Sequence, residues 1–169
     1  MHFSPFASLF QPPQICLQIG SLDFLLCILG LDWLRDAFRG VASNQIEGVI
    51  YFADDDNTYS LELFEEIRST HKVSVFPVGL VGGLMVEKPQ IVNGKVVGWD
   101  VTWSPNRPFA IDMAGFAVNL KHFLGKPKAK FAYQVKRGHQ ESEFLKHLVD
   151  SLDELEPKVV FNDFSSHTF

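Results

Sequence analysis

One short stretch constrains the fold and the chemistry of this chain more than any other: an apolar run from Gly48 to Ala53 that ends in Asp54, Asp55 and Asp56. Apolar side chains, many of them β-branched or aromatic, occupy both alternating positions of the run, which predicts a buried strand of a parallel sheet. In open α/β sheets, ligands bind just beyond the carboxyl ends of the strands. Carboxylate oxygens placed there suit Mg²⁺ or Mn²⁺ carrying a diphosphate. We therefore predict a metal-dependent site for phosphate esters or nucleotide sugars.

A solvated turn is the alternative interpretation of the three aspartates, because negative charge is favourable at the N-terminus of the helix expected next. However, three adjacent carboxylates repel one another, and a bound cation removes that cost. An apolar strand that directs them at a crevice is also an unusual setting for a surface turn. A metal site is the simpler explanation.

Composition restricts the classes of protein to consider. The 169 residues fit one domain, and 46% hydrophobic residues with 16 Phe can build a core. The net charge of −5 and the lack of a basic stripe with interleaved aromatics argue against nucleic acid as a partner. Two cysteines, Cys16 and Cys27, define no disulfide framework, and the six histidines lack the spacing of a zinc site.

The segment from Ile15 to Leu31 is apolar enough to suggest a membrane element. It contains Gln18, Ser21 and Asp23, whereas a membrane-spanning helix needs about 20 predominantly apolar residues. It also lacks the basic region that opens a secretory signal. We expect neither role for it.

Periodicity predicts the elements around the acidic motif. We expect a short helix over residues 31–38 and a helix over 59–70 whose inner face carries Leu61, Phe64 and Ile67. A further helix starts close to Glu141, with an apolar face made by Phe144, Leu145, Leu148, Val149 and Leu152.

Strands are expected on both sides of a turn at Asn93 and Gly94, which is a strong hairpin signal. A preceding strand over residues 73–81 contains Pro77, which favours an edge or a bulge. After the hairpin, Trp99 and Trp103 are expected on one side of a strand.

Trp103 and Asp112 are candidates for binding a ligand. Trp99 suits core packing, whereas Trp103 is nearer the loop at residues 104–108 and better placed to stack on a ligand. Asp112 lies in an apolar run, where a charge without a partner is costly.

Six motifs occur in order between about residues 31 and 158: YFADDDNTY at 51–59, VGGL at 81–84, VVG at 96–98, RPF at 107–109, DMAGFAV at 112–118 and GHQES at 138–142. Together they resemble the β-1,3-glucuronosyltransferases of glycosyltransferase family 43. The resemblance implies an α/β fold of the GT-A type, which is Rossmann-like. It also implies inverting transfer of glucuronic acid from UDP-glucuronate to the 3-hydroxyl of the terminal galactose in the linker of proteoglycans. A Golgi location with a type II membrane anchor, which we expect to lie outside this chain, and a homodimer are further implications.

On the donor side, the resemblance assigns roles to four residues. Asp56 would ligate Mn²⁺ bridging the UDP diphosphate, and Asp54 and Asp55 would contact the nucleotide. Arg137 matches a residue that contacts the donor.

On the acceptor side, Glu141 matches the catalytic base, and Glu87, Trp103, Arg107 and Asp112 match a galactose-binding surface. We expect the Glu141 carboxylate to face the acceptor within several ångströms of the aspartate motif. A carboxylate base and a divalent cation suit glycosyl transfer through an oxocarbenium-like state. Without the motif, Glu141 would be interpreted as a first-turn glutamate favoured by the helix dipole, and Arg107 as a solvated surface residue.

The resemblance does not cover the whole chain. Residues 1–30 match nothing in the family, residues 31–158 match part of its catalytic domain, and residues 159–169 diverge from it. We therefore expect an acceptor-side half with an incomplete sheet, poorly integrated residues 1–30 and no activity of the isolated chain.

Two other functions are compatible with parts of the sequence. The pattern Asp54-x-Asp56-x-Thr58 after an apolar strand opens haloacid-dehalogenase-like phosphohydrolases, in which the first aspartate is a nucleophile and the metal is Mg²⁺. That class also needs a downstream lysine and a second acidic pair at another strand end. The other alternative is a truncated, non-catalytic relative that binds galactosides.

Overall fold

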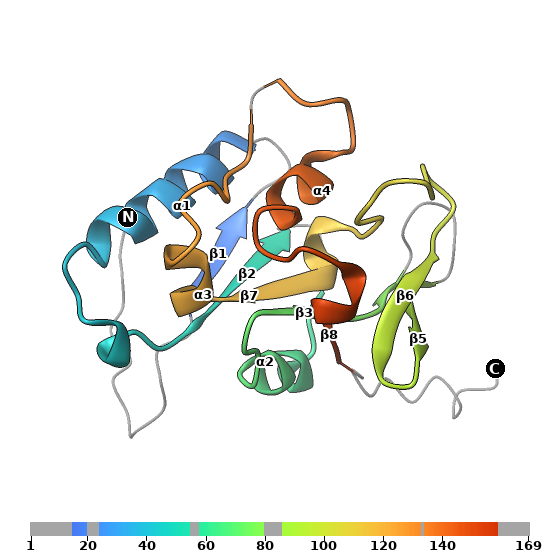
Figure 1. Cartoon of the computed structure of the whole chain (residues 1–169), viewed down its shortest axis with the longest axis horizontal. Coiled ribbons are helices and arrows are strands. Elements are labelled where there is room, and N and C mark those ends of the chain that lie inside the picture. The colour runs from blue at the N-terminus through green and yellow to red at the C-terminus, as the bar shows by residue number, and fades with distance from the viewer. Residues whose placement is uncertain (1–14, 20–23, 55–57, 80–85, 133, 159–169) are drawn as a thin grey trace.

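The chain forms a mixed α/β structure, seen in a computed structural model that describes residues 15–19, 24–54, 58–79, 86–132 and 134–158 (Figure 1). Its larger sheet has the strand order β1-β2-β7-β3-β8, and a smaller antiparallel sheet has the order β4-β5-β6. The strands are β1 (Ile15–Ile19), β2 (Val49–Asp54), β3 (Val73–Val75), β4 (Val78–Gly79), β5 (Val86–Val92), β6 (Lys95–Asp100), β7 (Phe116–Asn119) and β8 (Glu156–Pro157). The α-helices are α1 (Phe24–Ala37), α2 (Leu61–Ile67), α3 (Leu120–Leu124) and α4 (Gln140–Leu145), and the 3₁₀ helices are η1 (Ser43–Gln45), η2 (Met113–Gly115) and η3 (Leu152–Glu154).

Strand β2 is buried on both faces, as the apolar run predicted, with every residue from Val49 to Ala53 at most 5% exposed. It pairs in parallel with β1 and antiparallel with β7, so the sheet is mixed rather than purely parallel. Because side chains alternate along a strand, Ile50 and Phe52 join the core cluster under α1, α3 and α4, whereas Tyr51 joins the cluster under α2. In Figure 1 these helices cover opposite faces of the sheet.

Aromatic rings fill the core between the sheet and α4. The Phe144 ring stacks on Phe131, with centroids 4.6 Å apart, and meets Phe52 edge to face at 5.7 Å. Phe116 and Phe123 complete the group around Phe144, which is fully buried. Helix α4 is therefore anchored to the sheet through one of its own rings.

Replacing Phe144 with alanine should lower the free energy of unfolding by about 3–5 kcal/mol, because the change removes a buried ring and leaves a cavity. Urea unfolding of the 169-residue protein would measure the loss. Leu61→Ala is the matched control, since Leu61 is 80% exposed and its truncation should change stability by less than about 0.5 kcal/mol. A loss below about 1 kcal/mol for Phe144→Ala would mean that the ring is not a core residue.

Helix α2 occupies part of the range predicted for it, and its predicted inner face is confirmed at Ile67, which is buried, and at Phe64, which packs against the same cluster, but not at Leu61. The Ser60 hydroxyl caps it by accepting a hydrogen bond from the Leu63 amide at 3.3 Å. Leu63 and Ile67 are buried against Tyr51, whereas Leu61, predicted to face inward, points to solvent. Residues two positions apart on an α-helix are rotated by about 200° around its axis, so burial of Leu63 directs Leu61 outward.

The strand predicted over residues 73–81 is divided at Pro77. Its first part, β3, lies inside the larger sheet between β7 and β8, and its second part, β4, belongs to the smaller sheet. Proline has no amide hydrogen to donate to a ladder, which explains a break at this position. The VGGL motif at 81–84 lies outside the described residues.

The predicted hairpin is confirmed, since β5 pairs with β6 across Asn93 and Gly94, which have φ of 51° and 75°. Strand β6 ends at Asp100, so the prediction that it continues to Trp103 is wrong. Trp103 lies instead in a bend.

The prediction that residues 1–30 are poorly integrated is wrong for the part that the structure describes. Strand β1 pairs in parallel with β2 from Ile15 to Ile19, and α1 begins at Phe24 rather than at residue 31. Cys27 on α1 is buried in the core. No helix of the described ranges has both the length and the apolar character needed to cross a bilayer.

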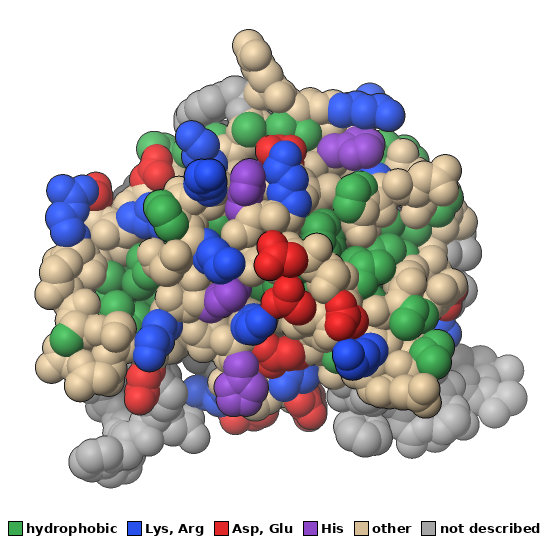
Figure 2. All heavy atoms as spheres, viewed as in Figure 1, with side chains coloured by type: hydrophobic (Ala, Val, Ile, Leu, Met, Phe, Trp, Pro, Cys, Tyr) green, Lys and Arg blue, Asp and Glu red, His purple; other side chains and the backbone are tan. Residues whose placement is uncertain are grey.

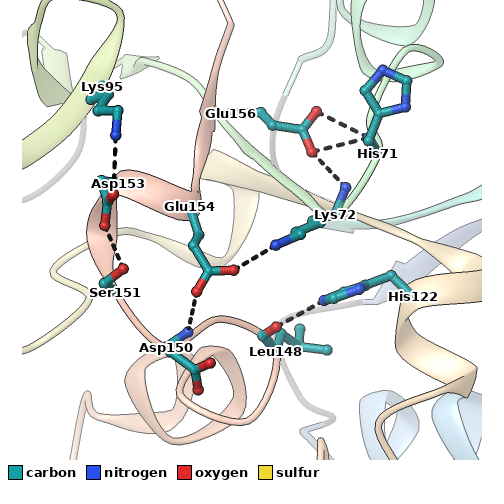
Figure 3. Close-up of polar contacts among 10 residues, drawn as sticks. All are labelled: His71, Lys72, Lys95, His122, Leu148, Asp150, Ser151, Asp153, Glu154 and Glu156. Carbon is teal, nitrogen blue, oxygen red and sulfur yellow. Dashed lines mark hydrogen bonds and ion pairs between the residues drawn. The ribbon is translucent and has the colours of Figure 1, made fainter.

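Polar contacts fasten η3 and β8 to the sheets (Figure 3). The Glu156 carboxylate accepts hydrogen bonds from the backbone amides of His71 and Lys72, and the Lys72 ammonium pairs with Glu154 at 2.6 Å. Lys95 on β6 pairs with Asp153 at 3.2 Å, which joins the hairpin to the same segment. Figure 2 shows acidic and basic side chains interspersed over the middle of this face, in keeping with such pairing.

Candidate active site

The acidic motif follows the buried strand directly. Asp54 is the last residue of β2, where its backbone is opposite Ile19 of β1. Asp55 and Asp56 lie outside the described residues, so their predicted roles stay predictions. Within the described ranges, no group of three His, Cys, Asp or Glu residues could hold a metal ion. The donor set that the sequence offers at the end of β2, the carboxylates of Asp54, Asp55 and Asp56 with their hard oxygen atoms, fits Mn²⁺ or Mg²⁺.

Glu141 lies in the first turn of α4 and is directed into the protein. Its side chain is 15% exposed, whereas Glu143 on the same helix is 31% exposed and pairs with Lys146 at 2.7 Å. Burial raises the pKa of Glu141, and the nearby charge of Arg107 opposes that rise. Oε2 of Glu141 has no hydrogen-bond partner within the described part of the chain. A buried carboxylate with a raised pKa and an oxygen that makes no hydrogen bond can act as a general base, a role that a solvated first-turn glutamate would not suggest.

Arg107 lies beside Glu141, and its side chain is 6% exposed, so it is not the solvated surface residue that the sequence would suggest without the motif. Its Nη1 lies 3.7 Å from Oε2 of Glu141 and donates a hydrogen bond of 2.6 Å to the Gly138 carbonyl. The guanidinium also stacks over the Trp103 ring, 4.8 Å from the centroid. Arg107 therefore connects the base candidate to an aromatic surface.

Two more carboxylates, those of Glu87 and Asp112, lie near Arg107 and Glu141. Glu87 on β5 is buried, which raises its pKa, and a hydrogen bond with the Thr102 backbone opposes the rise. The charges of Arg107 and Asp112 act on both Glu87 and Glu141. Asp112 is half-buried and caps η2, accepting a hydrogen bond of 2.9 Å from the Ala114 amide. The apolar surroundings of Asp112 predicted that its charge has a partner, and the backbone amide of Ala114 supplies one.

The aromatic residues separate as predicted. Trp99 packs against the core, whereas Trp103 is 46% exposed beside Arg107 and can present a ring to a ligand. Arg137 is exposed in the turn that precedes α4. The described structure therefore brings together Glu87, Trp103, Arg107, Asp112 and Glu141, and of the aspartate motif it describes the backbone of Asp54.

Gly138, which also contributes to this cluster, belongs to the GHQES motif, but the sequence predicted no role for it. Gly138, whose carbonyl holds Arg107, has φ of +70°, a conformation that favours glycine. A glycine in a turn directly before a helix was the available signal.

Comparison with known proteins gives matches over most of the chain. The model of glycosyltransferase family 43 matches residues 25–162. Galactosylgalactosylxylosylprotein 3-beta-glucuronosyltransferase 3 of Mus musculus is 56% identical over 134 residues, covering 76% of this chain and 40% of the relative. The corresponding enzyme 2 of Rattus norvegicus is 58% identical over 130 residues, covering 76% and 39%, and enzyme 1 of Homo sapiens is 58% identical over 132 residues, covering 77% and 39%. The chain therefore spans about 40% of the length of these relatives.

Proposed function

Because the chain belongs to glycosyltransferase family 43, we propose that it is the acceptor-binding part of a β-1,3-glucuronosyltransferase of GT-A fold. The family match confirms the resemblance carried by the motifs. The relatives are named for glucuronosyl transfer to a galactosylgalactosylxylosylprotein. We propose the same reaction for the full-length protein, with UDP-glucuronate as donor and the galactose-terminated linker of proteoglycans as acceptor.

One observation supports this proposal above others: the buried Glu141 carboxylate lies beside Arg107, next to an exposed tryptophan. In the proposed reaction, Glu141 takes the proton from the 3-hydroxyl of galactose as that oxygen attacks the anomeric carbon of glucuronate. Attack from the face opposite UDP inverts that carbon. Arg107 limits the rise in the pKa of Glu141 and so keeps a share of the carboxylate ionised.

The other polar groups of the cluster suit a sugar. Trp103 offers a ring face for stacking on galactose, and the carboxylates of Glu87 and Asp112 can accept hydrogen bonds from its hydroxyls. We propose that these three residues and Arg107 form the acceptor wall.

The donor side of the proposal rests on the sequence. Asp56, with Asp54 and Asp55 contacting the nucleotide, would hold Mn²⁺, which when bound offsets the charge that develops on the departing diphosphate. Arg137 would contact the donor from the turn before α4. A Golgi membrane location and a homodimer follow from the same resemblance and can be checked by imaging and sedimentation of the full-length protein.

A chimera tests the function directly. Residues 25–162 would replace the matching part of the Mus musculus relative, and transfer from UDP-glucuronate to a Gal-β1,3-Gal acceptor would be measured with Mn²⁺. We expect transfer by the chimera and little by the 169-residue polypeptide alone. Acceptor binding without turnover would favour a non-catalytic relative, and Mg²⁺-dependent release of phosphate from phosphate esters would favour a phosphohydrolase.

Replacing Trp103 with alanine in this chimera should raise the acceptor KM about tenfold and leave the donor KM unchanged. Stacking that covers on the order of 60 Å² of apolar sugar surface is worth about 1.5 kcal/mol, which corresponds to that factor. Trp33→Ala is the control, because Trp33 is 56% exposed on α1 and outside the cluster. An unchanged acceptor KM with weaker UDP binding would place the acceptor wall elsewhere.

A further inference from the structure

The backbone of Gly138 is in direct contact with the Trp103 ring. A Cβ atom at position 138 would lie 1.7 Å from Cη2 and 2.1 Å from Cζ3 of Trp103, far inside any permitted contact. Since the ring is held in place by Arg107 on its face, it would have to move to accept even a methyl group. The Trp103 ring therefore occupies the space that a side chain at position 138 would need.

The same glycine also fixes Arg107. Its carbonyl accepts the 2.6 Å hydrogen bond from Nη1, which is the nitrogen that lies 3.7 Å from Glu141. Gly138, Trp103 and Arg107 thus contact one another in a closed triangle, and α4 begins two residues after Gly138.

A second attachment lies on the other side of Glu141. The Ser142 hydroxyl donates a hydrogen bond of 2.8 Å to the Phe109 carbonyl and accepts one of 3.3 Å from the Phe109 amide. Both residues are buried. The segment 103–109 is therefore fastened near the start of α4 at two points, three residues before Glu141 and one residue after it.

We propose that Gly138 is a positioning residue of the acceptor site, because its bare backbone seats the Trp103 ring and the Arg107 guanidinium at a set distance from Glu141. The inference rests on the proposed function and deepens it by naming what holds the acceptor wall against the base. A side chain at position 138 would push the ring away from Glu141 and change the width of the site that receives galactose.

The test compares glycines that share a backbone conformation and differ in their surroundings. Gly138→Ala carries strain from φ of +70° and the contact with Trp103, whereas Gly40→Ala carries strain from φ of +79° with nothing within 4 Å of the added Cβ. The 169-residue protein would be labelled with fluorotryptophan, and ¹⁹F NMR would report its three tryptophans, Trp103 being assigned with Trp103→Phe. We expect Gly138→Ala to shift the Trp103 resonance alone and Gly40→Ala to shift none.

Rescue by a smaller ring provides the second measurement. Phenylalanine at position 103 lacks the outer atoms that the Cβ would meet, so in the Trp103→Phe background Gly138→Ala should cost no more stability in urea unfolding than Gly40→Ala. If Gly138→Ala alone does not fold, folding of the double variant supports the proposal. An unmoved Trp103 resonance, or an excess cost that persists in the double variant, would overturn it.

Sugar titration separates this inference from the proposed function. In the unaltered protein, a Gal-β1,3-Gal disaccharide should shift the Trp103 resonance, and Gly138→Ala should need at least about tenfold more disaccharide, since small misplacements in a site can cost up to about 10²-fold. Equal sugar binding by both proteins would overturn the positioning role. Absence of any sugar response would contradict the proposed function, and the sugar-free measurements would then decide whether Gly138 seats the ring.

Discussion

Replacing Glu141 with glutamine in the chimera is expected to lower turnover about 10²–10⁴-fold, the contribution typical of a general base. Glutamine has nearly the same shape but cannot take a proton from the acceptor hydroxyl. Folding should persist, because glutamine keeps the size of the side chain and Arg107, which loses its ion pair with Glu141, keeps its hydrogen bond to the Gly138 carbonyl. Turnover at saturating donor and acceptor measures the loss, and UDP binding should be retained.

Glu143→Gln is the matched control for this change. Glu143 is on the same helix but pairs with Lys146 near the surface, so its replacement should leave turnover within about twofold, as expected for surface changes. Equal losses for the two variants, or normal turnover after Glu141→Gln, would remove Glu141 from the mechanism.

The pKa of Glu141 adds a pH dependence to the same prediction. Because burial raises this pKa, the carboxylate form is lost at a higher pH than for an exposed glutamate, and turnover should fall on acidification through that raised pKa. The folded state binds this proton more tightly than the unfolded state does, so stability falls as pH rises from the unfolded to the folded pKa. Glu141→Gln removes this contribution to the pH dependence of stability, which urea unfolding of both proteins at several pH values would check.

Replacing Asp56 with alanine should abolish Mn²⁺-dependent transfer by the chimera. The motivation is the buried strand β2, which ends at Asp54, directly before Asp55 and Asp56 in the sequence. Ligands of open α/β sheets bind beyond the carboxyl ends of strands, and hard oxygen donors suit a divalent cation. If Asp56 holds the metal as proposed, its loss leaves the charge that develops on the diphosphate without a bound cation to offset it, and the barrier to transfer should rise.

Two readouts check the role of Asp56. Transfer would be measured against Mn²⁺ concentration, and Mn²⁺ binding in the presence of UDP by water proton relaxation. Asp36→Ala is the control, since Asp36 on α1 is an exposed carboxylate that pairs with Arg39 just after the helix. Transfer that survives both Asp56→Ala and a chelator would contradict the assignment.

Features encoded by neighbouring residues were predictable from the sequence. The hairpin at Asn93 and Gly94 follows from a turn type that needs positive φ at both positions, and the burial of β2 follows from its continuous apolar run. Features set by distant partners were not. Leu61 faces outward on α2 because Leu63 packs against Tyr51 of β2, and the attachment of β1 depends on a parallel partner more than 30 residues away.

In the candidate site too, the sequence predicted some features and not others. Motifs located Glu141 and Arg107, but local sequence favours a surface position for both, and their burial appears only when segment 103–109 lies against α4. The role of Gly138 is hidden for the same reason, because its close neighbour Trp103 is distant in the sequence.

Helix α4 has six residues, and its inward ring, Phe144, is the centre of the aromatic core. Glu141 is one turn away from that ring, so we expect unwinding of the first turn to loosen the packing of Phe144 on the sheet. Heating should therefore not produce a folded but inactive species by releasing this glutamate alone. In the chimera, thermal inactivation and loss of this core should coincide in one cooperative transition.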